Sequence, residues 1–166
     1  DTGFGWSYTY PLILSTDRHK QHKTIYKFFD YLRSVEFAER ITQFTGRGEP
    51  FVCYSFTLNS THPGSEVRPH KDGIQKNKDA KDSFLNIVFF INGTGGPNSG
   101  NLSLSRDPAL KDIIFEPHNL NNACLIYDSM ADFYHGFKPV ARGKFRWAIN
   151  SQFCKKSFVE NLAVSK

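Results

Sequence analysis

The sequence predicts a single, mainly β domain: an antiparallel double-sheet barrel of the jelly-roll type behind a helical N-terminal segment. The chain has 166 residues, the length of one ordinary domain that can bury a sizeable core. Apolar residues recur at helical spacing over residues 17–46, and short β-rich runs alternate with turn residues after residue 50. No internal repeat, low-complexity segment or linker divides residues 1–166, so we expect one domain.

The helical segment, residues 17–46, supports the barrel. Its apolar residues recur at three- and four-residue steps in two groups, Ile25, Phe28, Phe29 and Leu32, and then Phe37, Ile41 and Phe44. Ser34 can cap the second helix and Gly46 can end it. We expect these aromatic residues to pack on the core. The earlier apolar stretch, residues 8–14, is expected to cover a sheet edge.

Eight short β-rich runs follow over residues 51–153, which we expect to form the jelly-roll core. They are residues 51–58, 66–72, 84–92, 101–105, 112–115, 123–127, 134–140 and 145–153. Stretches rich in Gly, Pro and Asn separate them, as turns between strands require. Many short antiparallel strands are stable as two facing sheets, because each sheet buries one face against the other.

Composition favours a globular protein and gives little sign of a nucleic-acid or membrane partner. Hydrophobic residues make up 39% of the chain and aromatic residues 15%. The net charge of +5 is dispersed, with no long basic block, and we interpret it as a solvated surface. The longest apolar run, residues 84–91, is interrupted by Asn86 and is too short to cross a membrane.

The cysteines indicate a reducing environment. Cys53, Cys124 and Cys154 are widely spaced and odd in number, without a CxxC pair, so neither a disulfide framework nor a zinc site is expected. Free thiols suit a cytoplasmic location. The chain opens on Asp1 rather than Met, which leaves a preceding segment or a removed signal open.

A candidate metal site begins at His70-Lys71-Asp72-Gly73. In a strand, residues i and i+2 point to the same face, so the imidazole of His70 and the carboxylate of Asp72 converge. One more histidine from a distant strand would complete the two-histidine, one-carboxylate set that binds non-haem Fe(II) with positions left open. His135 opens the strand-like run 134–140 and is the expected third ligand. The other histidines lie at a polar helix start or in expected loops: His19, His22, His62 and His118.

Arg146 is a candidate anion-binding residue. Strand alternation puts it on one face with Ala148 and Asn150, and Trp147 on the other. A guanidinium on the inner face of a barrel needs an anion, and a dicarboxylic cosubstrate would fit, since Arg grips a carboxylate with two parallel hydrogen bonds. The alternatives are an internal salt bridge from Arg146 to Asp128 or Asp132, or a carboxylate-binding role for Arg142.

Four stretches in this order carry a family resemblance: His70-x-Asp72, Ser99-Gly100-Asn101-Leu102, Phe115-Glu116-Pro117 and His135-x-x-x-Pro139-Val140-x-x-Gly143-x-x-Arg146. They resemble the Fe(II)- and 2-oxoglutarate-dependent dioxygenases, in particular their prolyl-hydroxylase-like branch, and the resemblance covers roughly residues 51–153, most of the chain. His-x-Asp alone is a weak motif, whereas its occurrence with a late His and a following Arg is strong.

The resemblance implies a fold, a site and a reaction. The fold would be a double-stranded β-helix, the cupin-like form of the jelly roll. His70, Asp72 and His135 would bind iron, Arg146 would bind the distal carboxylate of 2-oxoglutarate, and Tyr54 would help to hold that cosubstrate. Fe(II), 2-oxoglutarate and dioxygen would be required, with ascorbate as an additional cofactor. The reaction would hydroxylate an unactivated C–H bond and release succinate and carbon dioxide.

Some positions depart from the family pattern. Phe89 and Phe90 stand where relatives often carry a tyrosine that contacts the cosubstrate, so that hydroxyl is missing or supplied elsewhere. Asn150 stands in place of a hydroxyl residue often found there. Asp72 keeps the carboxylate that related halogenases replace, which favours hydroxylation, with desaturation and ring closure also open.

The substrate is left open by the sequence. An amino-acid-like small molecule would need a counter-charge, which Arg68, Arg106 or Arg142 could supply. A peptidyl substrate such as a prolyl side chain would need an open groove, with residues 71–81 as one wall. A nucleic-acid demethylase is a weaker alternative, because the Arg-x-Asn-x-Thr-x-Arg motif of that branch is absent around Arg146. A non-catalytic jelly-roll binding module is the alternative from another class.

Overall fold

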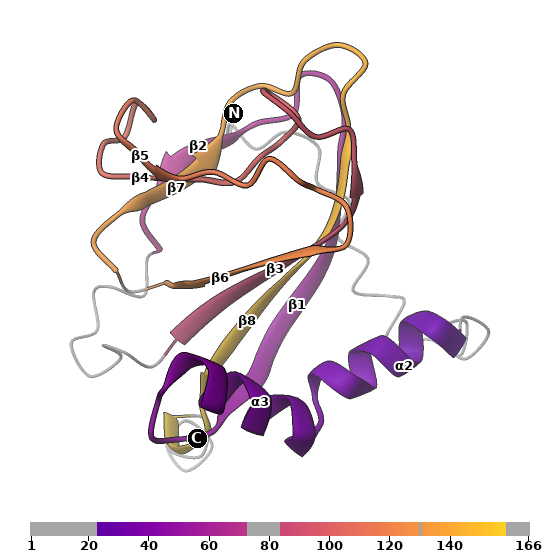
Figure 1. The fold of residues 1–166 in the computed structure, drawn as a ribbon, viewed down its shortest axis with the longest axis vertical. Coiled ribbons are helices and arrows are strands. Elements are labelled where there is room, and N and C mark those ends of the chain that lie inside the picture. Colours follow the sequence, from indigo (N-terminus) through magenta and orange to yellow (C-terminus); the bar gives the residue numbers. More distant parts are fainter. Residues whose placement is uncertain (1–22, 73–83, 130, 159–166) are drawn as a thin grey trace, which may run out of the picture.

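In the described part of the chain, the helices α2 (Lys23–Leu32) and α3 (Val35–Thr45) and two antiparallel sheets form a layered barrel (Figure 1). The structure is a computed structural model, and it describes residues 23–72, 84–129 and 131–158. The prediction that residues 8–14 cover a sheet edge lies outside the described residues, as does the predicted helical stretch before Lys23. The mainly β, jelly-roll fold class predicted from the strand pattern is confirmed.

The helices α2 (Lys23–Leu32) and α3 (Val35–Thr45) lie within the predicted helical segment. Ser34 begins α3, because its side-chain oxygen accepts a hydrogen bond from the Phe37 N–H at 3.1 Å. Gly46 ends α3 in the left-handed conformation, at φ 66°, where a glycine avoids the steric cost of a Cβ atom. Both predicted caps are therefore confirmed.

The strands form two four-stranded sheets that face each other. The major sheet has the order β1-β8-β3-β6, and the minor sheet has the order β2-β7-β4-β5. All neighbouring pairs are antiparallel. The bounds are β1 Phe51–Thr61, β2 Val67–His70, β3 Phe84–Gly93, β4 Ser103–Ser105, β5 Ile113–Phe115, β6 Ala123–Asp128, β7 Tyr134–Phe137 and β8 Arg146–Lys155. Each strand overlaps one of the eight predicted runs, although β1 and β8 continue beyond theirs, to Thr61 and Lys155.

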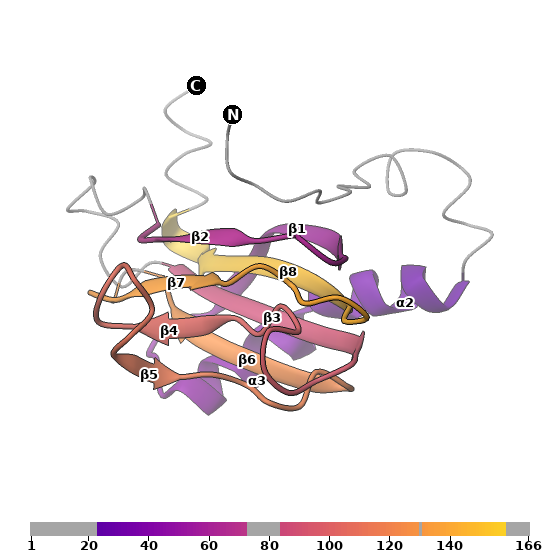
Figure 2. The same cartoon turned by 90° about the horizontal axis from the view of Figure 1, so that it is seen from above.

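The major sheet buries both of its faces, and it does so by strand alternation. In β3, Leu85 and Ile87 pack against the helices, whereas Val88 and Phe90 face the minor sheet. Figure 1 shows the resulting layers of minor sheet, major sheet and helices, and Figure 2 shows the minor-sheet strands lying over those of the major sheet. The space between the sheets is where the predicted site residues would have to meet.

Strands β2 and β7 approach each other closely at Gly136. A Cβ atom at this position would lie 2.5 Å from the Val67 carbonyl oxygen and 3.0 Å from the Pro69 nitrogen, so only glycine fits. The register between the strands shifts between Val67 and His70, and it ends with His70 directly opposite His135. Close approach and register together bring two imidazoles that are distant in sequence to one place.

Two expectations from composition can be compared with the described part of the chain. None of its helices is both long and apolar enough to cross a membrane. Cys53, Cys124 and Cys154 are all free thiols, as their spacing predicts, and Cys154 is buried. Burial raises the pKa of the Cys154 thiol to about 11, so this side chain stays protonated and acts as part of the core.

Candidate metal centre

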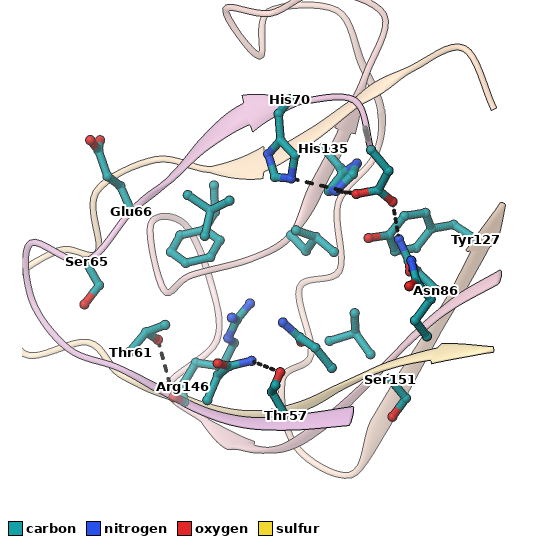
Figure 3. Close-up of a pocket in the computed structure, with 18 of the residues that line it drawn as sticks. Thr57, Thr61, Ser65, Glu66, His70, Asn86, Tyr127, His135, Arg146 and Ser151 are labelled. Carbon is teal, nitrogen blue, oxygen red and sulfur yellow. Dashed lines mark hydrogen bonds and ion pairs between the residues drawn. The ribbon is translucent and has the colours of Figure 1, made fainter. Parts of the chain in front are cut away.

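His70, Asp72 and His135 converge between the sheets, as the sequence predicts. Figure 3 shows the two imidazoles next to each other. His70 ends β2, Asp72 follows it by two residues, and His135 lies in β7. One possible ligand atom from each residue lies within 4.8 Å of the other two. The Asp72 Oδ1 atom is 3.5 Å from His135 Nε2 and 4.0 Å from His70 Nε2. The three side chains are therefore placed to bind one metal ion.

Two neighbouring contacts orient these ligands. His70 Nδ1 lies 2.8 Å from the Arg68 carbonyl oxygen, and because a carbonyl only accepts, Nδ1 carries the proton and Nε2 presents its lone pair. Asn86 Nδ2 donates a hydrogen bond to Asp72 Oδ2 at 2.7 Å, which leaves Oδ1 facing the histidines. Supporting contacts of this kind fix the tautomer and orientation of metal ligands in proteins.

The electrostatics of the triad keep Asp72 ionised. Burial acts to raise the pKa of Asp72, but the hydrogen bond and charge of His135, with the bond from Asn86, lower it below its ordinary value. Two imidazole nitrogens and one carboxylate oxygen form the donor set that suits non-haem Fe(II). The chemistry of the residues present therefore fits a ferrous ion.

The triad lines one side of a cavity of about 390 Å³ between the two sheets. Its opposite wall comes from the inner faces of β1 and β8 and is rich in hydroxyl and amide groups. The lining residues are Ser55, Thr57, Asn59, Thr61, Ser65, Glu66, Val67, His70, Asp72, Asn86, Val88, Leu102, Tyr127, His135, Phe137, Arg146, Asn150, Ser151 and Gln152. A small organic molecule can thus reach the candidate metal ligands and the polar wall together.

Arg146 lines the same cavity and is 3% exposed. Its Nη1 atom donates a hydrogen bond to the Gly100 carbonyl at 2.6 Å, and its guanidinium lies 4.7 Å from the Phe137 ring centroid. Burial lowers the pKa of Arg146 to about 10, so the side chain remains a cation at neutral pH. Its Nε atom has no hydrogen-bond partner among the described residues. A buried cation with an unused donor is placed to receive an anion.

The salt bridge considered as an alternative for Arg146 does not form among the described residues. Asp128 pairs instead with Arg47 at 2.6 Å, and Asp132 pairs with Lys71. Arg142, the alternative carboxylate binder, is exposed and is not among the residues that line the cavity. Of the arginines weighed for this role, Arg146 is the one that the structure brings to the triad.

The structure does not bring Tyr54 to the cavity. Its side chain is 53% exposed and packs edge-on against Phe84, with 6.1 Å between the ring centroids. The pairing of β1 with β8 shifts register between Cys53 and Ser55, which leaves Tyr54 as an extra residue in β1. The β1 side chains that line the cavity are Ser55, Thr57, Asn59 and Thr61, and Tyr54 lies at the bulge just before them.

Two residues that the sequence reasoning missed join the site. Asn86 on β3 and Tyr127 on β6 are cross-strand partners, and both line the cavity (Figure 3). Asn86 had a signal, because it is a polar residue inside an otherwise apolar buried run. The only sequence signal for Tyr127 was its position in the alternation of a short strand. An inward-facing tyrosine at such a position is also typical of a packed core.

Comparisons with known proteins give likeness in structure alone. No family model matches the chain, and no curated protein matches its sequence. An oxidoreductase of the 2OG-Fe(II) oxygenase family from Burkholderia pseudomallei is 12% identical with a TM-score of 0.57, over 77% of this chain and 56% of that protein. A prolyl-4-hydroxylase from Pseudomonas putida is 20% identical with a TM-score of 0.50, over 76% and 64%. The protein AviO1 from Streptomyces viridochromogenes is 19% identical with a TM-score of 0.56, over 76% and 60%.

The shared feature of these matches is the barrel. The chain spans 56% to 64% of the length of the three proteins, and the identities are low. The predicted resemblance to the Fe(II)- and 2-oxoglutarate-dependent dioxygenases, including a prolyl hydroxylase, is therefore confirmed at the level of architecture. The chain has the fold of the 2OG-Fe(II) oxygenases.

Proposed function

We propose that the chain is an Fe(II)- and 2-oxoglutarate-dependent oxygenase that hydroxylates an unactivated C–H bond. One observation carries the proposal: the His70, Asp72 and His135 ligand atoms lie within 4.8 Å of one another in the cavity that also holds the buried cation of Arg146. A metal site alone is common to many functions. A metal site beside a desolvated guanidinium suits a cosubstrate that both chelates a metal and carries a distant carboxylate.

Each residue has a defined task in this proposal. His70 Nε2, Asp72 Oδ1 and His135 Nε2 would hold the ion, which, when bound with 2-oxoglutarate and dioxygen, supplies the oxidising chemistry. Asn86 keeps the Asp72 carboxylate turned toward the ion through its 2.7 Å hydrogen bond. Arg146 would orient the cosubstrate by its far carboxylate, and the low dielectric around it strengthens that contact. Ascorbate remains an implication of the family resemblance only.

The arginines weighed as counter-charges do not favour a free amino acid as the substrate. Arg68 is exposed and lies 3.7 Å from Glu66, Arg106 pairs with Asp112 at 3.1 Å, and neither lines the cavity among the described residues. The counter-charge that a free amino acid would need is thus not supplied by the candidate arginines. A peptidyl side chain such as proline, the class named for the Pseudomonas putida neighbour, carries no such charge.

The test is spectroscopic and begins with metal and cosubstrate. Anaerobic addition of Fe(II) and then 2-oxoglutarate to the protein is expected to produce the weak visible charge-transfer band of the chelate. His135→Ala should lose both metal affinity and the band. Arg146→Met should keep the metal but weaken 2-oxoglutarate binding by roughly 100-fold, since it removes a buried charge-assisted partner. Arg142→Met, which changes an exposed arginine, is the matched control and should bind like the parent.

Two outcomes would count against the proposal. The absence of a band, together with no succinate release across a panel of proline-containing peptides, would remove the oxygenase assignment. Equal metal content in His135→Ala and the parent would show that the triad does not bind metal, and would favour a non-catalytic jelly-roll binding module.

A further inference from the structure

Tyr127 is a buried phenol that the proposed function leaves without a task. It is 8% exposed, lies on the inner face of β6, and its ring centroid is 5.3 Å from that of His135. Figure 3 shows its hydroxyl end directed into the cavity, on the side of Asn86 and His135. Among the described residues that line the cavity, no other side chain is a tyrosine. Buried tyrosine hydroxyls usually have a polar partner, and this one faces the polar cavity.

The charges around Tyr127 place it between the two halves of the site. Burial raises the pKa of Tyr127, the Asp72 carboxylate raises it further, and Arg146 and a hydrogen bond with Asn86 act in the opposite direction. The Tyr127 hydroxyl therefore interacts electrostatically with both the Asp72 carboxylate and the Arg146 guanidinium. A phenol hydroxyl can donate one hydrogen bond, so it is available to an anion bound between these two groups.

The neighbouring strand cannot provide this donor. Phe89 points to the helix side of the major sheet, where its ring meets Phe28 edge-on at 5.4 Å. Phe90 points inward, but it packs in the core, with its ring centroid 5.6 Å from the Arg146 guanidinium. Tyr127 pairs across the sheet with Asn86, four residues before Phe90. The hydroxyl that the sequence lacks on β3 is thus present on β6, one strand away.

We propose that the Tyr127 hydroxyl donates a hydrogen bond to the 2-oxo acid cosubstrate, at a point between the metal ligands and Arg146. This inference rests on the proposed function, because it assigns a further binding residue to the same site. Tyr127 also forms a hydrogen bond with Asn86. Asn86 in turn donates a hydrogen bond to Asp72 Oδ2 at 2.7 Å and accepts one from Gln152 at 3.4 Å. The phenol is consequently held in place by groups that are themselves fixed by the triad.

The experiment compares Tyr127→Phe with Tyr54→Phe by anaerobic titration calorimetry, using Mn(II) in place of iron and 2-oxoglutarate as the probe. Each variant loses one hydroxyl, but Tyr54 lies outside the cavity. Tyr127→Phe is expected to raise the dissociation constant for 2-oxoglutarate roughly tenfold, as loss of a hydrogen bond to a charged group does, with unchanged Mn(II) affinity. Tyr54→Phe should match the parent in both measurements.

The outcomes separate this inference from the function on which it rests. Equal 2-oxoglutarate affinity in Tyr127→Phe and the parent would overturn the inference alone, provided that Arg146→Met still weakens binding. A loss of Mn(II) affinity in Tyr127→Phe by the same factor would assign Tyr127 a structural role and would also overturn it. A parent that binds no 2-oxoglutarate at all would remove the proposed function, and the inference with it.

Discussion

The two sheets of the barrel differ in how firmly they are built. The major-sheet strands run from 6 to 11 residues, pair in long registers, and are covered by helices on one face. The minor-sheet strands are 3 or 4 residues long, and each of their ladders pairs only two or three positions. Long paired strands with a buried face supply most of the stability of a sheet protein, so the major sheet is the scaffold.

The candidate site is divided between these unequal parts. His70, Asp72 and His135 belong to the minor sheet or its margin, whereas Arg146 and Tyr127 project from the major sheet. A cosubstrate bound to both groups would join the sheets, and a metal ion alone would join β2 to β7. Substitutions in the major sheet should therefore unfold the protein. Substitutions in the minor sheet should weaken metal binding before they unfold the protein.

The largest effect is expected from Phe153→Ala in the scaffold. Phe153 is fully buried in β8 and packs on the α3 residue Phe37 at 5.4 Å between ring centroids. The cavity left by the ring should lower the free energy of unfolding by about 3–5 kcal/mol, measured by urea denaturation. Phe44→Ala, at a position that is 77% exposed, is the control and should change it by less than about 0.5 kcal/mol. Similar losses in the two variants would contradict the assignment of the scaffold.

An intermediate loss of stability, together with weaker metal binding, is expected from Gly136→Ala. The added methyl group would lie 2.5 Å from the Val67 carbonyl oxygen, so β2 must move away from β7 and take His70 with it. We expect a stability loss of about 1–3 kcal/mol, with Mn(II) affinity reduced at least roughly tenfold by calorimetry. Gly48→Ala, where an added Cβ meets open space, should leave both quantities unchanged. Normal metal affinity in Gly136→Ala would show that the close approach does not set the site.

The smallest effect is expected at Asp107, in the loop between β4 and β5. The backbone N–H of Asp112, followed by those of Ala109 and Lys111, lowers the pKa of the Asp107 carboxyl. A pKa lowered by folding means that the carboxylate stabilises the fold above its unfolded pKa of about 3.9, and that this contribution is lost as the pH falls through the folded value.

Asp107→Asn should therefore melt slightly below the parent at pH 7, and the gap should close as the pH falls below about 4. Melting temperature measured against pH checks this, with Asp30→Asn on the exposed face of α2 as the control. A gap that persists unchanged in acid would mean that the carboxylate charge is not what holds the loop.

Sequence reasoning succeeded where one local rule decides the outcome. Alternation put Arg146 on the inner face of β8, and the Ser34 and Gly46 signals fixed the ends of α3. It also placed His70, Asp72 and His135 together, because a jelly roll brings strands β2 and β7 side by side. These predictions needed no knowledge of how neighbouring side chains pack.

Sequence reasoning did not anticipate a change of strand register. The bulge at Tyr54 depends on how β1 pairs with β8 across 10 positions, and no residue within β1 indicates it. Tyr127 escaped notice for the related reason that its partner, Asn86, lies on another strand. Cross-strand pairs become visible only when the sheet order is known, so the contacts that complete the site could not be found from the sequence.

The two imidazoles of the triad are unequally protected, with 41% of the His70 side chain exposed and 8% of that of His135. His70 also ends β2, an edge strand of the minor sheet, whereas β7 has a neighbour on each side. Edge strands open at lower free energy than interior ones, so in the proposed metal site His70 would be the first ligand to be released. Asp72 and His135 would then remain to hold the ion, and the rate of metal exchange would depend on the fraying of one four-residue strand.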